Sequence, residues 1–126
     1  MPTPPMRFSV DDVERLVGQA LDELPEDFAR LLDNVVVMVE EEPTAEDLES
    51  VGMSRDAGDE LFGLYHGVPL TERDTFYDSL PDRVVIYAGP IRRAFDDPRE
   101  AVDEIKKTVV HELGHFFGMD EDQMPY

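Results

Sequence analysis

The sequence contains no cysteine, and only three of its 126 residues are histidine. The absence of cysteine excludes disulfide bonds and thiolate metal sites, and it agrees with the cytoplasmic location that we expect. No stretch approaches the 18 consecutive apolar residues of a membrane-spanning helix, so we expect no contact with a membrane. The N-terminus also lacks the apolar core of a signal peptide, and the proline-rich residues 1–7 are predicted to form a disordered tail.

Basic side chains are scarce as well. The chain has 11 Lys and Arg against 30 Asp and Glu, which gives a formal net charge of −19. A negative field of this size repels phosphate backbones, so nucleic acid is not an expected partner. The field could attract basic substrates, but we prefer the simpler interpretation that it keeps the protein soluble, as a monomer or a weak homodimer.

The length fits one domain with a modest core, which we place at residues 8–126. Apolar residues at helical spacing follow Ser9, a good N-cap, and predict an N-terminal helix. The segment Asp97-Pro98-Arg99-Glu100 is typical of a helix start and leads into an apolar stripe that predicts a long helix over residues 98–117. Apolar and β-branched runs predict three strands, at residues 35–39, 61–65 and 82–87.

Two of the predicted strands have features that suggest their places in the sheet. The run from Val35 to Val39 is apolar at every position, which predicts a buried, central strand. Gly63 interrupts the strand at 61–65, and a glycine there indicates a bulge or the close approach of another backbone. His66 follows that strand, and we interpret it as a loop histidine without a ligand role.

The residues with the clearest chemistry lie near the C-terminus, in the motif His111-Glu112-Leu113-Gly114-His115. Residues four apart lie one above the other on a helix, so two imidazoles can be directed at one point. Neutral imidazole is a good zinc ligand. Glu112 directly follows the first histidine and therefore points to the side of the metal, which suits a general base acting on a water that the metal activates.

Gly118 follows the motif and can end the helix with a positive φ, so that the chain turns back. A run of acids comes next and is within reach to supply a further metal ligand: Asp120, Glu121 and Asp122.

Six segments together make the sequence resemble the small zincin-like metallopeptidases of bacteria, sometimes called mini-zincins. They are residues 24–26, 34–37, 63–65, 67–73, 80–84 and 109–115. The resemblance extends from about Phe8 to Asp122 and is far more specific than the zinc motif alone. It implies a compact α+β fold, a minimal zincin-like domain in which a small sheet of about three strands packs with an N-terminal helix and a long C-terminal active-site helix.

The family pattern places a third zinc ligand, usually Asp, ten residues after the first histidine. That position is Glu121 here, and Asp120 lies one residue early, so the sequence departs from the pattern. The resemblance implies zinc ligation by His111, His115 and Glu121, with Asp120 as the alternative third ligand. The chain is too short after Gly118 for a methionine turn, but Met124 or Tyr126 could fold back beside the site.

These features favour a zinc-dependent metallopeptidase in which Glu112 is the general base and the substrate is a peptide or protein. One alternative is a binding module that keeps the scaffold and turns over little. Another is a structural zinc site, which would need a fourth protein ligand and would have no use for Glu112. The strand at 61–65 or the strand at 82–87 could pair with an extended substrate at a sheet edge.

Overall fold

The computed structural model describes residues 9–53, 60–67, 82–119 and 122, and its α+β architecture agrees with the predicted fold class. The predicted tail at residues 1–7 lies outside the described residues. The elements follow one another as α1 (Val10–Asp22), α2 (Glu26–Leu31), η1 (Leu32–Asn34), β1 (Val35–Glu40), α3 (Ala45–Ser50), β2 (Gly63–His66), β3 (Asp82–Tyr87), α4 (Ala88–Ala94) and α5 (Pro98–Phe116).

The three strands form one mixed sheet in the order β1-β3-β2. Strand β1 is parallel to β3, and β2 is antiparallel to it. The prediction that residues 35–39 form the central strand is therefore wrong. The burial of β1 alternates along its length, and Val36 and Met38 are 45% and 43% exposed. The central position belongs to β3, where Val84, Val85 and Ile86 are buried on both faces.

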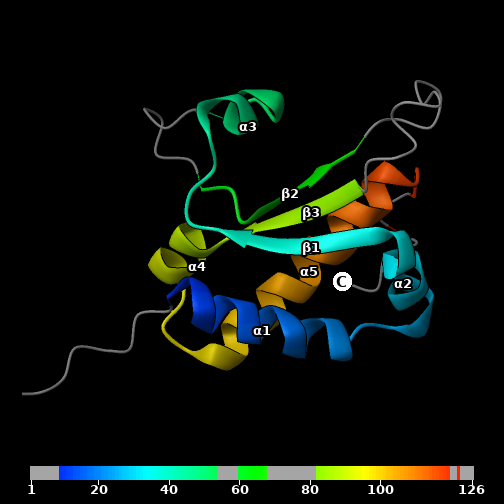
Figure 1. Cartoon of the computed structure of the whole chain (residues 1–126), viewed down its shortest axis with the longest axis horizontal. Coiled ribbons are helices and arrows are strands. Elements are labelled where there is room, and N and C mark those ends of the chain that lie inside the picture. Colours follow the sequence, from blue (N-terminus) through cyan, green and yellow to red (C-terminus); the bar gives the residue numbers. More distant parts are fainter. Residues whose placement is uncertain (1–8, 54–59, 68–81, 120–121, 123–126) are drawn as a thin grey trace, which may run out of the picture.

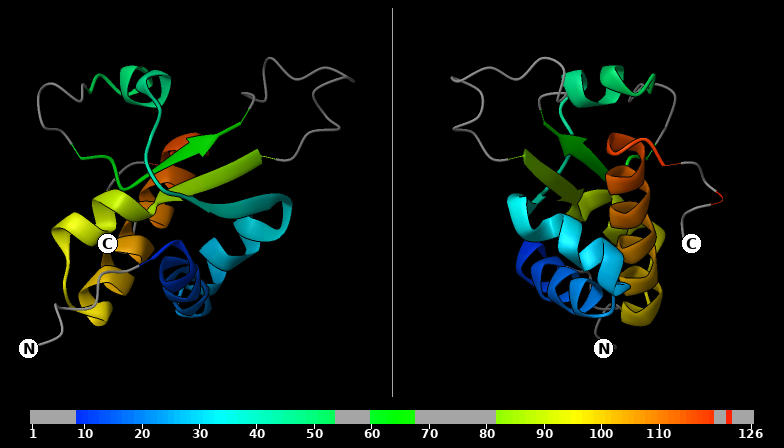
Figure 2. Two further views of the ribbon diagram at one scale, coloured as in Figure 1. Left: turned by 60° about the vertical axis from the view of Figure 1, so that its left-hand side comes forward. Right: turned by 90° about the vertical axis from the view of Figure 1, so that its right-hand side faces the viewer.

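Helices cover the two faces of the sheet unequally (Figures 1 and 2). Helices α1 and α5 pack side by side on one face, and the main core lies between them and the sheet. Helix α3 lies on the opposite face, where Leu48 packs with Val85 and Tyr87 in a smaller cluster. No helix among the described residues is long and apolar enough to cross a membrane.

Both long helices begin as the sequence predicts. Ser9 caps α1 in a capping box with Asp12: the Ser9 side chain accepts a hydrogen bond from the Asp12 backbone N–H, and the Asp12 carboxylate accepts one from the Ser9 N–H. Asp97 caps α5 by accepting a hydrogen bond from the Arg99 N–H, and Pro98 occupies the first helical position. These caps satisfy backbone N–H groups that have no partner within the helix.

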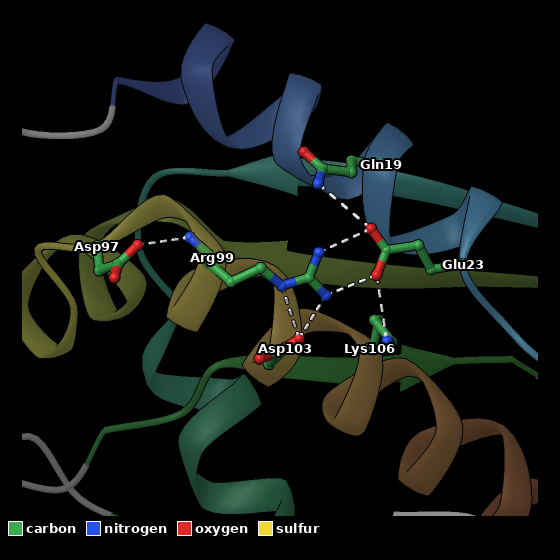
Figure 3. A network of polar contacts seen from close by, with 6 residues as sticks. All are labelled: Gln19, Glu23, Asp97, Arg99, Asp103 and Lys106. Carbon is green, nitrogen blue, oxygen red and sulfur yellow. Dashed lines mark hydrogen bonds and ion pairs between the residues drawn. The ribbon is translucent and has the colours of Figure 1, made fainter.

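An ion-pair network joins α1 to the N-terminal half of α5 (Figure 3). The Glu23 carboxylate accepts hydrogen bonds of 2.6 and 2.9 Å from the Arg99 guanidinium and one of 3.2 Å from Lys106. Arg99 also donates to Asp103 on its own helix. These hydrogen bonds hold the pKa of Glu23 at about 2, well below its ordinary value. The network therefore helps to fix α5, which carries the zinc motif, relative to α1.

Candidate metal centre

Helix α5 carries the zinc motif in its last two turns and ends where the sequence predicts. Gly118 has a φ of +76°. The Gly118 N–H donates to the His115 carbonyl at 3.2 Å, and the Met119 N–H donates to the Gly114 carbonyl at 2.8 Å. This pair of hydrogen bonds is a Schellman motif, which reverses the chain after the helix. Met119 is partly buried against the main core, so the chain returns toward the body of the domain.

A groove with a volume of about 280 Å³ runs between α5 and the segment that leads into β2. His111, Glu112 and His115 all line this groove. Further along α5 it is lined by Glu104, Lys107 and Thr108, and on the opposite side by Leu61, Phe62 and Gly63. The structure thus brings three of the four predicted site residues into one concave surface.

The two histidines are arranged so that they could share a metal ion. Their ring centres are 6.0 Å apart and the rings are nearly perpendicular, at 87°. Two imidazoles bound to one tetrahedral zinc ion at 2.0–2.1 Å have ring centres about 5 Å apart. A small rotation of the half-buried His111 or the exposed His115 would close the difference, so the pair fits zinc.

The third ligand cannot be placed in the same way, because Asp120, Glu121, Met124 and Tyr126 lie outside the described residues. Within the part that the structure does describe, no three His, Asp or Glu side chains gather as a metal-binding group. Asp122 is described and is exposed. The choice between Glu121 and Asp120 therefore stays a prediction.

Glu112 has a partner that the sequence did not reveal. The backbone N–H of Tyr65, on β2, donates a hydrogen bond of 2.9 Å to Glu112 Oε1. The register explains why this N–H is available. The Tyr87 N–H donates to the Phe62 carbonyl, and backbone groups along an antiparallel strand alternate in direction, so Gly63 and Tyr65 direct theirs away from β3.

The side chain of Tyr65 joins β2 to its neighbours. Its ring stacks on Phe116 of α5, with ring centres 4.1 Å apart and planes inclined by 16°. Its hydroxyl donates a hydrogen bond of 2.7 Å to Asp82 at the start of β3. Sequence spacing gives no sign of a contact between residues 65 and 112, although Gly63 did indicate a close approach in this strand.

His66 lies within β2, not in a loop as predicted, and it is not part of the groove. Its Nε2 is 3.7 Å from Asp47 Oδ1, beside α3 on the other face of the sheet. The Tyr87 hydroxyl donates a hydrogen bond of 2.8 Å to the same carboxylate. Burial opposes ionisation of Asp47, but the hydrogen bonds from Tyr87 and Thr44 outweigh it and lower the pKa of that carboxyl.

Comparison with known proteins gives the class to which this fold and site belong. A family model described as zincin-like metallopeptidase matches residues 32–126. The chain therefore belongs to the zincin-like metallopeptidases, which confirms the resemblance noted in the sequence. A conserved hypothetical protein from Thermo thermophilus has a similar structure, with a TM-score of 0.59 and 25% sequence identity over 87% of this chain and 94% of that chain. No curated protein matches the chain.

Proposed function

We propose that this protein is a zinc-dependent peptidase that cleaves peptide bonds in the groove between α5 and β2. One observation carries the proposal: the two histidines and the glutamate of the motif line the same groove, and its other side is formed by the segment that leads into the edge strand β2. Membership of a metallopeptidase family supports it.

Each residue of the groove has a part in the proposed reaction. His111 and His115 would hold zinc with a third ligand, which we assign to Glu121. Zinc bound there would lower the pKa of a water molecule toward 7 and polarise the substrate carbonyl. Glu112 would accept a proton from the attacking water and later deliver it to the leaving amine.

The sheet order narrows the choice of strand for substrate pairing. Strand β3 is hydrogen-bonded on both sides, so it cannot take a further strand. Strand β2 is an edge among the described strands, and Gly63, which lines the groove, directs its backbone N–H and C=O away from β3. An extended peptide that paired with Gly63 would pass beside His111 and Glu112, and main-chain hydrogen bonds of this kind bind peptides with little regard to sequence.

Replacement of Glu112 by glutamine tests the chemistry separately from metal binding. The purified, zinc-loaded protein would be assayed on a broad peptide library, with cleavage detected by mass spectrometry. Glu112→Gln keeps the shape of the side chain but cannot accept a proton, so we expect activity to fall by about 100-fold or more at unchanged zinc content. Glu46→Gln, an exposed carboxylate on α3, is the control and should retain activity.

Two outcomes would contradict the proposal. Equal activity in the wild type and Glu112→Gln would remove Glu112 from the mechanism. Zinc binding without cleavage of any library peptide would favour a binding module that keeps the zincin-like scaffold.

A further inference from the structure

We propose that Tyr65 is a positioning residue for Glu112, and that Gly63 is the residue that makes this positioning possible. The Tyr65 backbone N–H fixes Glu112 Oε1 at 2.9 Å. Glu112 lines the groove, and among the described residues its Oε2 has no hydrogen-bond partner, so one oxygen of the carboxylate is anchored and the other is not. The catalytic consequence rests on the proposed function, whereas the contact itself is a property of the metal-free chain.

The contact requires β2 to lie close to α5, and the lack of a side chain at Gly63 leaves room for this. A Cβ atom on Gly63 would lie 2.7 Å from Thr108 Cγ2, 2.9 Å from Ile86 Cδ1 and 3.0 Å from the Val85 carbonyl oxygen. Carbon atoms do not approach one another so closely without a shift of the backbone or side chains. Any larger residue at position 63 would therefore require a shift of the Thr108 side chain, the Ile86 side chain or the β2 backbone, and a backbone shift would move β2 relative to α5.

The strand is held to the helix on both sides of Glu112. Thr108, Glu112 and Phe116 follow one another at intervals of four residues, so they share the face of α5 that meets β2. Thr108 lies against Gly63, Glu112 accepts the hydrogen bond from Tyr65, and Phe116 stacks on the Tyr65 ring. A shift of β2 at Gly63 would thus also move the Tyr65 N–H, two residues later, which donates the hydrogen bond to Glu112.

The anchor matters because a glutamate side chain is otherwise flexible. Its carboxylate rotates among several orientations, and only some of them place an oxygen within reach of the attacking water. A hydrogen bond from a backbone N–H to a charged acceptor is among the stronger kinds, and its donor cannot move independently of the strand. Fixing a catalytic group in its productive orientation before the substrate arrives lowers the barrier to reaction.

Amide hydrogen exchange in the metal-free protein tests the contact without any need for activity. We expect Glu112→Ala to accelerate exchange of the Tyr65 amide by about tenfold or more, because a hydrogen bond to a charged acceptor is lost. The amides of Leu64 and His66 point toward β3 and are the internal controls, so their exchange should not change. Unchanged exchange at Tyr65 would overturn the proposal, and so would equal acceleration at all three amides, which would show a general loosening of the strand.

Gly63→Ala tests whether the close approach of β2 to α5 depends on the glycine. A compensating substitution at Thr108 distinguishes a local steric effect from misfolding. The added methyl should accelerate Tyr65 exchange as Glu112→Ala does. Thr108→Ser removes Cγ2 but keeps the hydroxyl that donates to Glu104, so the double variant Gly63→Ala/Thr108→Ser should recover much of the protection. If Tyr65 exchange in Gly63→Ala equals that of the wild type, Gly63 is not the residue that permits the contact.

A kinetic comparison tests the catalytic consequence. Gly63→Ala should lower kcat by about tenfold, with zinc content unchanged and a smaller effect on KM, because the base is displaced and not removed. In a Glu112→Gln background, which has no base to position, Gly63→Ala should have little further effect. Equal losses in both backgrounds would mean that Gly63 acts only on stability or substrate binding. A wild type without peptidase activity would refute the proposed function, while the exchange experiment would still decide whether Tyr65 holds Glu112.

Discussion

The residues of the candidate centre differ in how far the sequence alone could predict them. His111, Glu112 and His115 lie within one helical turn, so their spacing is enough to place them together. The Tyr65 contact with Glu112 joins residues 47 positions apart and depends on how closely a strand packs against a helix. A glycine in a predicted strand was the only trace of that packing in the sequence. Contacts within one helix are therefore predictable here, whereas the contact between Tyr65 and Glu112 is not.

The third zinc ligand is the residue-scale prediction that follows from the helix end. Gly118 reverses the chain, and position 121 matches the spacing of the family pattern, whereas position 120 falls one residue short. We therefore expect Glu121→Gln to weaken zinc affinity much more than Asp120→Asn, as measured by competition with a zinc chelator. Loss of a residue that only hydrogen-bonds to a ligand typically weakens metal affinity by about 10- to 100-fold. Loss of a ligand itself should weaken it more. The opposite order of the two variants would assign the third ligand to Asp120.

At the scale of the elements, the sequence predicted the helix caps but not the order of the strands in the sheet. Helix starts at Ser9 and Asp97 depend on a few neighbouring residues, and both were predicted correctly. The run at 35–39 was placed at the centre of the sheet because every residue in it is apolar. The structure leaves Val36 and Met38 exposed at an edge, because strand order is decided by how distant segments pair. Hydrophobicity alone does not distinguish these two positions.

The Glu23–Arg99 network between α1 and α5 should make stability depend on pH. The pKa of Glu23 is lowered to about 2 in the folded protein from an ordinary 4.5. Its ionised form therefore stabilises the fold above about pH 4.5, and this contribution is lost as the pH falls toward 2. We expect Glu23→Gln to lower the unfolding temperature by a few degrees near neutral pH, and the difference from the wild type to vanish in strong acid, as followed by circular dichroism.

A matched control is available on α2. Glu26 pairs with Arg30 within one helix and, among the described residues, has no ion pair to another element, so Glu26→Gln should change the unfolding temperature less than Glu23→Gln does. A deficit in Glu23→Gln that is equally large near neutral pH and in strong acid would mean that the charge of Glu23 is not what stabilises the fold.

At the scale of the whole molecule, the sequence predicted the class of protein better than it predicted how the elements are arranged. Apolar runs predicted the three strands of the described sheet, and six segments along the chain indicated the family that the comparison with known proteins confirms. The groove required the structure, because it forms where β2 and α5, separated by more than thirty residues, come together. Its position at the edge of the sheet supports the proposal that a peptide binds beside the motif.

The central claim is that His111 and His115 hold a zinc ion in this groove, and the zinc content of purified variants tests it most directly. Inductively coupled plasma mass spectrometry would be applied to the wild type, His111→Ala, His115→Ala and His66→Ala after equal exposure to zinc. His66 is the control, because it lies on the other face of the sheet beside Asp47. We expect about one zinc ion per chain in the wild type and in His66→Ala, and almost none in the other two variants. Wild-type zinc content in both His111→Ala and His115→Ala would contradict the account.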